Sequence, residues 1–360
     1  MDKRLMRGNH VIAEAAIRAG CKCYFGYPIT PQNELCEYMA ENLPKYKGRT
    51  FIQAESELAA INMVLGAAVT GARVMTSSSS PGISLKQEGI SFLCGQELPA
   101  VVVNMVRGGP GLGNIAPSQA DYFQATRGGG HGDYRTIVLA PSALQELVDL
   151  TFLAFDLADK YRNPVIILGD GLLGQMMEPV VFPDFIPLEK LPKKEWALTG
   201  REGRASSFSR SLILDTKEME EHNWKLYRKY QLITRKEIRY ESFMLEDAQI
   251  TLVAYGVAAR IARGAIKRAR KEGMKVGLIR PITLWPFPSD FIRESASTIK
   301  EFIVFELNTG QMLEDVKLAL EGQAKVHFYG RPGGAIPTPV ELGWVISRYY
   351  HQAEKQGNIL

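Results

Sequence analysis

Glu57 is the side chain in this sequence that is best placed for proton chemistry. It opens the apolar run from Glu57 to Gly66, which predicts a helix whose small residues allow close packing. The dipole of that helix stabilises a carboxylate in the first turn, and a glutamate placed there can hydrogen-bond a ring nitrogen of a bound heterocycle. On spacing alone, the simpler interpretation is an acid at a helix start, and Glu55 fits it as well.

Two more polar side chains follow predicted strands. Arg107 comes directly after the apolar run 98–106, and Thr30 lies in the turn after the strand 22–26. Because α/β proteins bind ligands at the carboxyl edge of the sheet, both are candidate binding groups. A guanidinium offers paired donors to a carboxylate. The plain alternatives are a surface arginine and, for Thr30, the cap of a helix that begins at Pro31.

Three glycine-rich segments offer weaker signals. Residues 111–116 match a dinucleotide fingerprint, which would suit a nicotinamide-dependent dehydrogenase, but Pro117 interrupts the helix that should receive the pyrophosphate. Residues 169–171 resemble the start of a diphosphate and magnesium site, yet the expected asparagine is missing, and a strand-end turn explains them better. The lone His131 lies in the glycine-rich loop 128–133, where a flexible turn is the simpler interpretation.

The elements that must position these groups alternate between strands and helices. Predicted strands lie at 22–26, 51–52, 73–76, 98–106, 136–140 and 164–168, and predicted helices at 9–19 (capped by Asn9), from Pro31, and at 57–70. Strands that are apolar on both faces belong in a parallel sheet covered by helices. Residues 179–243 predict a connector with a charged helix at 216–241. A second α/β pattern follows, with strands at 250–254, 275–278 and 302–306 and helices at 257–272 and 311–320.

Composition limits the class of protein. The 360 residues are 46% hydrophobic and 23% charged, as in an ordinary globular protein of about two domains. A net charge of +4 is too small to predict a nucleic-acid partner, and no apolar run is long enough to predict a membrane span. The four cysteines lack CxxC spacing, so we expect no zinc or iron–sulfur ligands on this chain and a reducing, cytoplasmic location.

Four ordered motifs together resemble a known family. They are Tyr27-Pro28-Ile29-Thr30-Pro31, the segment 53–62, the segment 76–82, and Arg107-Gly108-Gly109-Pro110. In this order the chain resembles the alpha subunits of the 2-oxoacid:ferredoxin oxidoreductases, in the form that acts on a branched-chain substrate, 2-oxoisovalerate. The likeness covers nearly the whole chain, through residues 138–141 and 306–311.

The resemblance implies an α/β fold of two domains. Residues 1–178 would form the pyrimidine-binding domain of a thiamine diphosphate enzyme, a parallel sheet with helices on both faces. Residues 179–243 would be the connector, and residues 244–360 a smaller α/β domain like the transketolase C-terminal domain.

The resemblance also implies which acid serves the cofactor. In the family, a glutamate nine residues before a helical glycine contacts the aminopyrimidine of thiamine diphosphate and shares a proton with it. Counting back from Gly66 selects Glu57, whereas anchoring the motif on Gln53 selects Glu55. This shared proton prepares the cofactor to attack a 2-oxo group.

Other residues are implied to surround the cofactor and the substrate. Pro28 and Ile29 would bind the cofactor. Thr30 would hydrogen-bond the substrate near its oxo group, and Arg107 would pair with its carboxylate. Many relatives have Ser-Thr after the Gly-Gly-Pro, where this chain has Gly111-Leu112. The apolar Leu112 favours a branched aliphatic or aryl 2-oxo acid over 2-oxoglutarate, whose second carboxylate needs donors.

Several parts of this chemistry are missing from the sequence. It lacks ligands for the diphosphate, for Mg²⁺ and for 4Fe-4S clusters, so a beta subunit should supply them, in a hetero-oligomer with a gamma subunit and a ferredoxin-like delta subunit. The expected reaction is oxidative decarboxylation of a 2-oxo acid to an acyl-coenzyme A, with electrons passed to ferredoxin. The alternatives are a 2-oxoglutarate-specific subunit and a non-catalytic scaffold subunit.

Overall fold

The computed structural model describes residues 3–359. The candidate residues lie on the larger of its sheets. Its strand order is β12-β6-β7-β5-β4-β2-β3. All neighbouring strands run parallel except β12, which pairs antiparallel with β6 at the edge. The strands are β2 (Cys23–Gly26), β3 (Thr50–Gln53), β4 (Val74–Ser78), β5 (Ala100–Val106), β6 (Ile137–Leu139), β7 (Pro164–Asp170) and β12 (Thr283–Trp285). The central strands β4, β5 and β7 are buried along their whole length, as their apolar sequences predict.

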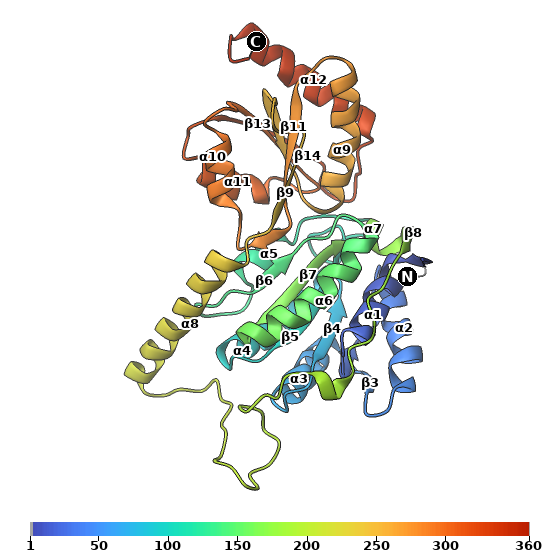
Figure 1. Cartoon of the computed structure of the whole chain (residues 1–360), viewed down its shortest axis with the longest axis vertical. Helices are drawn as coiled ribbons and strands as arrows, with labels where there is room; N and C mark the ends of the chain where they lie inside the picture. Colours follow the sequence, from blue (N-terminus) through green and yellow to red (C-terminus); the bar gives the residue numbers. More distant parts are fainter. Residues whose placement is uncertain (1–2, 360) are drawn as a thin grey trace.

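Helices pack on this sheet in two groups (Figure 1). One group is α1 with α2 and α6, and the other is α3 with α4. Their bounds are α1 (Gly8–Arg18), α2 (Asn33–Asn42), α3 (Glu57–Ala68), α4 (Ser80–Gly95) and α6 (Leu144–Tyr161). Two short helices, α5 (Tyr122–Arg127) and α7 (Gly171–Gln175), and a ribbon of β1 (Arg4–Arg7) with β8 (Met177–Val180) complete this part. The predicted α/β architecture is confirmed.

A second, smaller sheet lies in the upper half of Figure 1, in the order β14-β13-β10-β11-β9. Its strands are β9 (Tyr240–Phe243), β10 (Ile250–Val253), β11 (Val276–Pro281), β13 (Glu301–Glu306) and β14 (Lys325–Gly330). They are parallel except β9. The accompanying helices are α9 (Gly256–Lys271), α10 (Ser289–Ser295), α11 (Gln311–Leu320) and α12 (Pro339–Lys355).

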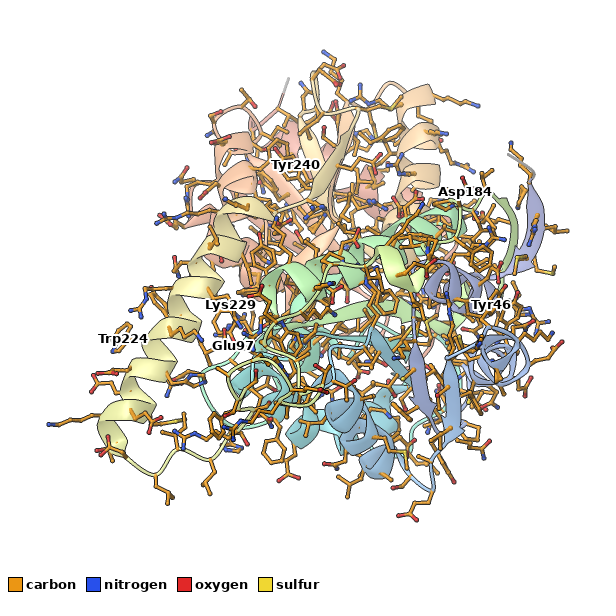
Figure 2. The ribbon with its side chains drawn as sticks, turned by 60° about the horizontal axis from the view of Figure 1, so that its bottom comes forward. Tyr46, Glu97, Asp184, Trp224, Lys229 and Tyr240 are labelled. Carbon is orange, nitrogen blue, oxygen red and sulfur yellow. The ribbon has the colours of Figure 1, made fainter. Side chains whose placement is uncertain are left out.

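The segment between the two sheets contains the long helix α8 (Thr216–Lys236), which ends before the predicted Glu241. It lies along the side of the larger sheet and follows an extended loop (Figure 1). Lys225 and Lys229 on α8 both pair with Glu97, and Figure 2 shows Lys229 beside that residue. These ion pairs fix the helix to the end of α4.

The two sheets are joined by backbone pairing as well as by side chains. β12 comes from the second half of the chain, yet it forms the edge of the larger sheet. Gln119 is buried at the junction: its side chain donates to the Tyr255 carbonyl at 2.9 Å and accepts from the Leu307 N–H at 3.0 Å. The fully buried Arg280 pairs with Glu146 at 2.6 Å. Polar groups thus satisfy one another across the junction.

Two predicted caps are wrong, and tertiary contacts explain both. Asn9 lies inside α1, where its amide donates to the Pro31 carbonyl at 2.8 Å. The helix expected from Pro31 begins at Asn33, so Thr30 is not its cap. No helix among residues 3–359 is both long and apolar enough to cross a lipid bilayer.

Candidate active site

The predicted site residues meet at the carboxyl edge of the larger sheet. Thr30 follows β2, Glu57 follows β3, and Arg107 follows β5. Strand β4 lies between β2 and β5, and its polypeptide continues through Ser79 into α4. The turn after β4 therefore lies among the three residues.

Glu57 is the first residue of α3 and is only 6% exposed. Ser56 caps the helix, because its hydroxyl accepts a hydrogen bond from the Ala59 N–H at 3.2 Å. No group in residues 3–359 hydrogen-bonds to the carboxyl oxygens of Glu57. Buried carboxyl groups usually have such partners, so this one is available to a ligand.

Gly82 of α4 faces the Glu57 carboxyl group. A Cβ atom at position 82 would lie 2.5 Å from Oε1 of Glu57 and 2.0 Å from Oγ of Ser78. Gly89 serves the same purpose further along, because a Cβ atom there would lie 2.5 Å from Cγ1 of Ile61. The two glycines let α4 approach α3 closely. This tertiary packing explains a helix that the serine- and glycine-rich sequence does not predict.

The alternative acid, Glu55, has a different environment. It lies in the turn between β3 and α3 and is exposed. Burial and the close approach of Gly82 therefore distinguish Glu57 from Glu55.

Arg107 is buried and brings the other predicted residues together. Its Nη1 donates to the carbonyl of Thr30 and its Nη2 to the carbonyl of Leu112, both at 3.0 Å. Its backbone N–H donates to Oγ of Ser80 at 3.0 Å, which ties it to the start of α4. The Nε atom is buried and has no partner within the described chain. The guanidinium thus keeps an unsatisfied donor at the sheet edge.

The remaining predicted residues lie around this arginine. Ile29 and Thr30 are half-buried and Pro28 is exposed, all in the turn after β2. The Thr30 hydroxyl accepts from the Asn33 amide at 3.4 Å. Leu112 is 82% exposed, so its side chain contacts little of this chain.

The loop that carries Leu112 is not a dinucleotide site. The Gly108 N–H donates to the Ala116 carbonyl and the Asn114 N–H donates to the Gly108 carbonyl, both at 2.9 Å, which folds the segment back on itself. The next helix is α5, beginning at Tyr122, so no helix N-terminus faces the glycines. The Asn114 amide also donates to the carbonyl of Gly333 at 2.9 Å. The second half of the chain thus holds this loop in place.

The two other glycine segments also have structural explanations. Asp170 caps α7, accepting from the N–H groups of Leu172 and Leu173 at 3.0 Å, and burial raises its pKa to about 6. Residues 169–171 thus form the end of β7 and the start of α7 rather than the predicted turn. His131 is exposed in its loop, where its carbonyl accepts from the Ser91 hydroxyl. No group of three His, Cys, Asp or Glu side chains in residues 3–359 is arranged to hold a metal ion.

Lys86 is a residue at this edge that sequence reasoning missed. Its side chain is fully buried, and its ammonium group donates to Oγ1 of Thr76 at 3.1 Å and to the Glu57 carbonyl at 3.5 Å. Burial lowers its pKa to about 8, although the Glu57 charge opposes this shift. The available signal was the spacing of Gly82, Lys86 and Gly89, which share one helix face.

Comparison with known proteins decides the family. A family model described as the thiamine diphosphate-binding part of pyruvate flavodoxin/ferredoxin oxidoreductase matches residues 14–242, and one for core domain II of pyruvate:ferredoxin oxidoreductase matches residues 248–342. The chain belongs to the 2-oxoacid:ferredoxin oxidoreductases. It is 54% identical to ketoisovalerate oxidoreductase subunit VorB of Methanothermobacter marburgensis, over 93% of this chain and 94% of that one. It is 35% identical to 2-oxoglutarate synthase subunit KorA of Methanothermobacter thermautotrophicus, over 95% and 97%.

Solved structures agree with this family. The 2-oxoglutarate:ferredoxin oxidoreductase of Magnetococcus marinus superimposes with a TM-score of 0.85 at 28% identity, covering 96% of this chain. This oxidoreductase chain spans only 65% of that longer polypeptide. A split-gene transketolase shares the fold alone, with a TM-score of 0.59 at 14% identity and coverage of 95% and 97%. The predicted resemblance to the alpha subunits of this family is confirmed.

Proposed function

We propose that this chain is the alpha subunit of a thiamine diphosphate-dependent oxidoreductase that converts a branched-chain 2-oxo acid to its acyl-coenzyme A and passes the electrons to ferredoxin. The observation that carries the proposal is the buried Glu57 carboxyl group, which accepts no hydrogen bond from residues 3–359 and lies at the same sheet edge as Arg107.

The polar groups at this edge fit an aminopyrimidine. The Oγ atoms of Ser78 and Ser79 are buried without partners in the described chain, and such atoms destabilise a protein unless something satisfies them. A side chain at position 82 would collide with Ser78 and Glu57, so glycine is needed there to keep these polar groups in place. Glu57 would hold the ring, with Pro28 and Ile29 bordering it. When bound, thiamine diphosphate supplies the nucleophilic carbon for attack on a 2-oxo group.

The residues of this chain have distinct roles in the proposed reaction. Glu57 holds or releases a proton at its carboxyl oxygen, where the cofactor ring is bound. Arg107 uses its free donor to bind the substrate carboxylate, while its Thr30 and Leu112 contacts orient the guanidinium. The hydroxyl of Thr30 binds the substrate near its oxo group.

A branched-chain substrate is supported by the loop and by a relative. Leu112 has an exposed apolar side chain, and its backbone carbonyl contacts the Arg107 guanidinium. A relative that is 54% identical is called a ketoisovalerate oxidoreductase subunit. Because 2-oxoglutarate would place a second carboxylate in this region, Leu112 disfavours it. The 2-oxoglutarate-specific alternative therefore has less support.

Partner subunits complete the proposed site. A beta subunit would bring the diphosphate, Mg²⁺ and cluster ligands, and gamma and ferredoxin-like delta subunits would complete the hetero-oligomer. The apolar side chains of Leu58, Met63 and Leu85 are exposed on α3 and α4, which suits a protein partner on these helices. The four cysteines are free thiols, in keeping with the proposed cytoplasmic location.

A matched pair of variants tests the proposal. In the complex with its partner subunits, Glu57→Gln should lower the rate of low-potential dye reduction, driven by 2-oxoisovalerate and coenzyme A, by about 100-fold or more, the range expected for a lost acid–base group. Glu55→Gln, two positions away and exposed, should keep full activity. A fully active Glu57→Gln complex would favour the scaffold alternative.

A further inference from the structure

The charge environment of Glu57 contains one more ionisable group that needs explanation. Lys86 is the fourth residue after Gly82 and the third before Gly89, so it lies on the α4 face that packs against α3. The glycines on either side let the two helices approach closely, and the lysine side chain is fully buried. A buried ammonium is costly unless it is paired.

The partners of this ammonium are few. It donates to the hydroxyl of Thr76 on β4 and to the backbone carbonyl of Glu57 on α3. The ionisable groups that raise its pKa are Glu57 and, on α2, Cys36. The Cys36 thiol is itself buried, and burial raises its pKa, so it is neutral near pH 7. Glu57 is therefore the counter-charge of Lys86.

We propose that Lys86 is a positioning residue of the active site, which holds the first turn of α3 through the Glu57 carbonyl and balances the charge of the Glu57 carboxylate. This inference rests on the proposed function, because the role of Lys86 is exerted through Glu57. An opposite charge close to a carboxyl group favours the charged form of that group.

The proposal is tested by counting the protons that accompany cofactor binding. The complex, stripped of cofactor, is titrated with thiamine diphosphate and Mg²⁺ in a calorimeter, in two buffers of different ionisation enthalpy. We expect Lys86→Met to lower the number of protons taken up on binding, because the substitution removes the positive charge that faces the Glu57 carboxyl group. Lys229→Met is the matched control: Lys229 is also largely buried and its pKa is also lowered by burial, but it pairs with Glu97. An unchanged proton count in Lys86→Met would overturn the proposal.

A stability cycle without cofactor separates the two hypotheses. Glu57→Gln should lower the Tm more in the wild-type background than in the Lys86→Met background, because the methionine leaves no buried charge to balance. A difference of roughly 2 to 4 °C is expected for a coupled pair. Additive changes in Tm would refute the pairing itself. If the Tm changes are coupled but Glu57→Gln binds the cofactor as tightly as wild type, the proposed role of Glu57 is refuted. The role of Lys86 in the active site is then refuted with it.

A second variant guards against misfolding of Lys86→Met. Thr76→Val removes the hydroxyl acceptor at 3.1 Å but keeps the lysine and nearly the same volume. It should shift the proton count in the same direction by a smaller amount. A count equal to that of wild type in this variant as well would contradict the proposal.

Discussion

Arg107 and Thr30 are 77 residues apart in sequence, yet the guanidinium of the first donates to the carbonyl of the second at 3.0 Å. The contact joins the ends of β5 and β2, which are separated in the sheet by β4. The same guanidinium reaches the carbonyl of Leu112. A single planar group thus sets the relative position of the turn after β2 and the loop after β5.

The first prediction concerns the two carbonyl contacts of the Arg107 guanidinium. Arg107→Lys keeps the positive charge but cannot donate to two carbonyls in a fixed plane. We expect the KM for the 2-oxo acid to rise about tenfold or more, the cost of one charge-assisted contact, with cofactor affinity near that of wild type. Steady-state kinetics of the assembled complex measure both. Arg127→Lys, on the exposed side of α5, is the control, and an unchanged KM in Arg107→Lys would remove Arg107 from the substrate site.

The second prediction concerns the approach of α4 to Glu57. Gly82→Ala places a methyl group 2.5 Å from Oε1 of Glu57, and the carboxyl group must move. We expect activity to fall strongly, with a loss of stability of about 1 to 3 kcal/mol from overpacking. Gly95→Ala, at the end of the same helix, meets nothing within 4 Å and should be neutral. Thermal unfolding and dye reduction of both variants provide the comparison, and equal behaviour would contradict it.

The third prediction concerns substrate choice. Leu112→Thr replaces an exposed apolar side chain with a donor without touching Gly111, whose φ of +69° favours glycine. The ratio of kcat/KM for 2-oxoisovalerate over 2-oxoglutarate should fall about tenfold, within the range of one apolar contact. Ile115→Thr changes another exposed residue of the loop and should leave the ratio near that of wild type. The substrate inference fails if both variants keep the wild-type ratio.

The fourth prediction is a pH dependence of stability. Burial raises the pKa of Glu306 to about 7, although N–H groups of Met312 and Leu313 donate to it. Because its pKa is higher in the folded than in the unfolded chain, the stability it contributes is lost as the pH rises from about 4.5 to about 7. Glu306→Gln should remove this dependence. The Tm difference between wild type and variant, measured at pH 5 and pH 8, should therefore change in favour of the variant, and a constant difference would contradict the assignment.

Sequence patterns predicted the elements whose signals are local. Apolar runs gave β5 and β7, and the run from Glu57 gave α3 from its first residue. They failed where a tertiary contact decides. The glycines of α4 disfavour a helix in isolation. The helix forms because Gly82 and Gly89 leave room for the side chains of Glu57 and Ile61 to pack against it.

The candidate site was predictable in part for the same reason. Strand ends placed Thr30 and Arg107 at one edge, and in the structure the Arg107 guanidinium contacts the carbonyl groups of both Thr30 and Leu112. Nothing local in the sequence separates Glu55 from Glu57, because the difference is burial beneath α4. Lys86 was missed because a lysine on a helix is usually solvated.

The pairing of β12 with β6 has a consequence for how the chain can be cut. A fragment that stops at residue 243 would lack the strand that covers β6. Its unpaired backbone N–H and carbonyl groups would then offer a template to other chains, so such a fragment should aggregate rather than remain monomeric. The same pairing ties the second half of the chain to the larger sheet, so any hinge motion between the halves must keep or break the hydrogen bonds between β12 and β6.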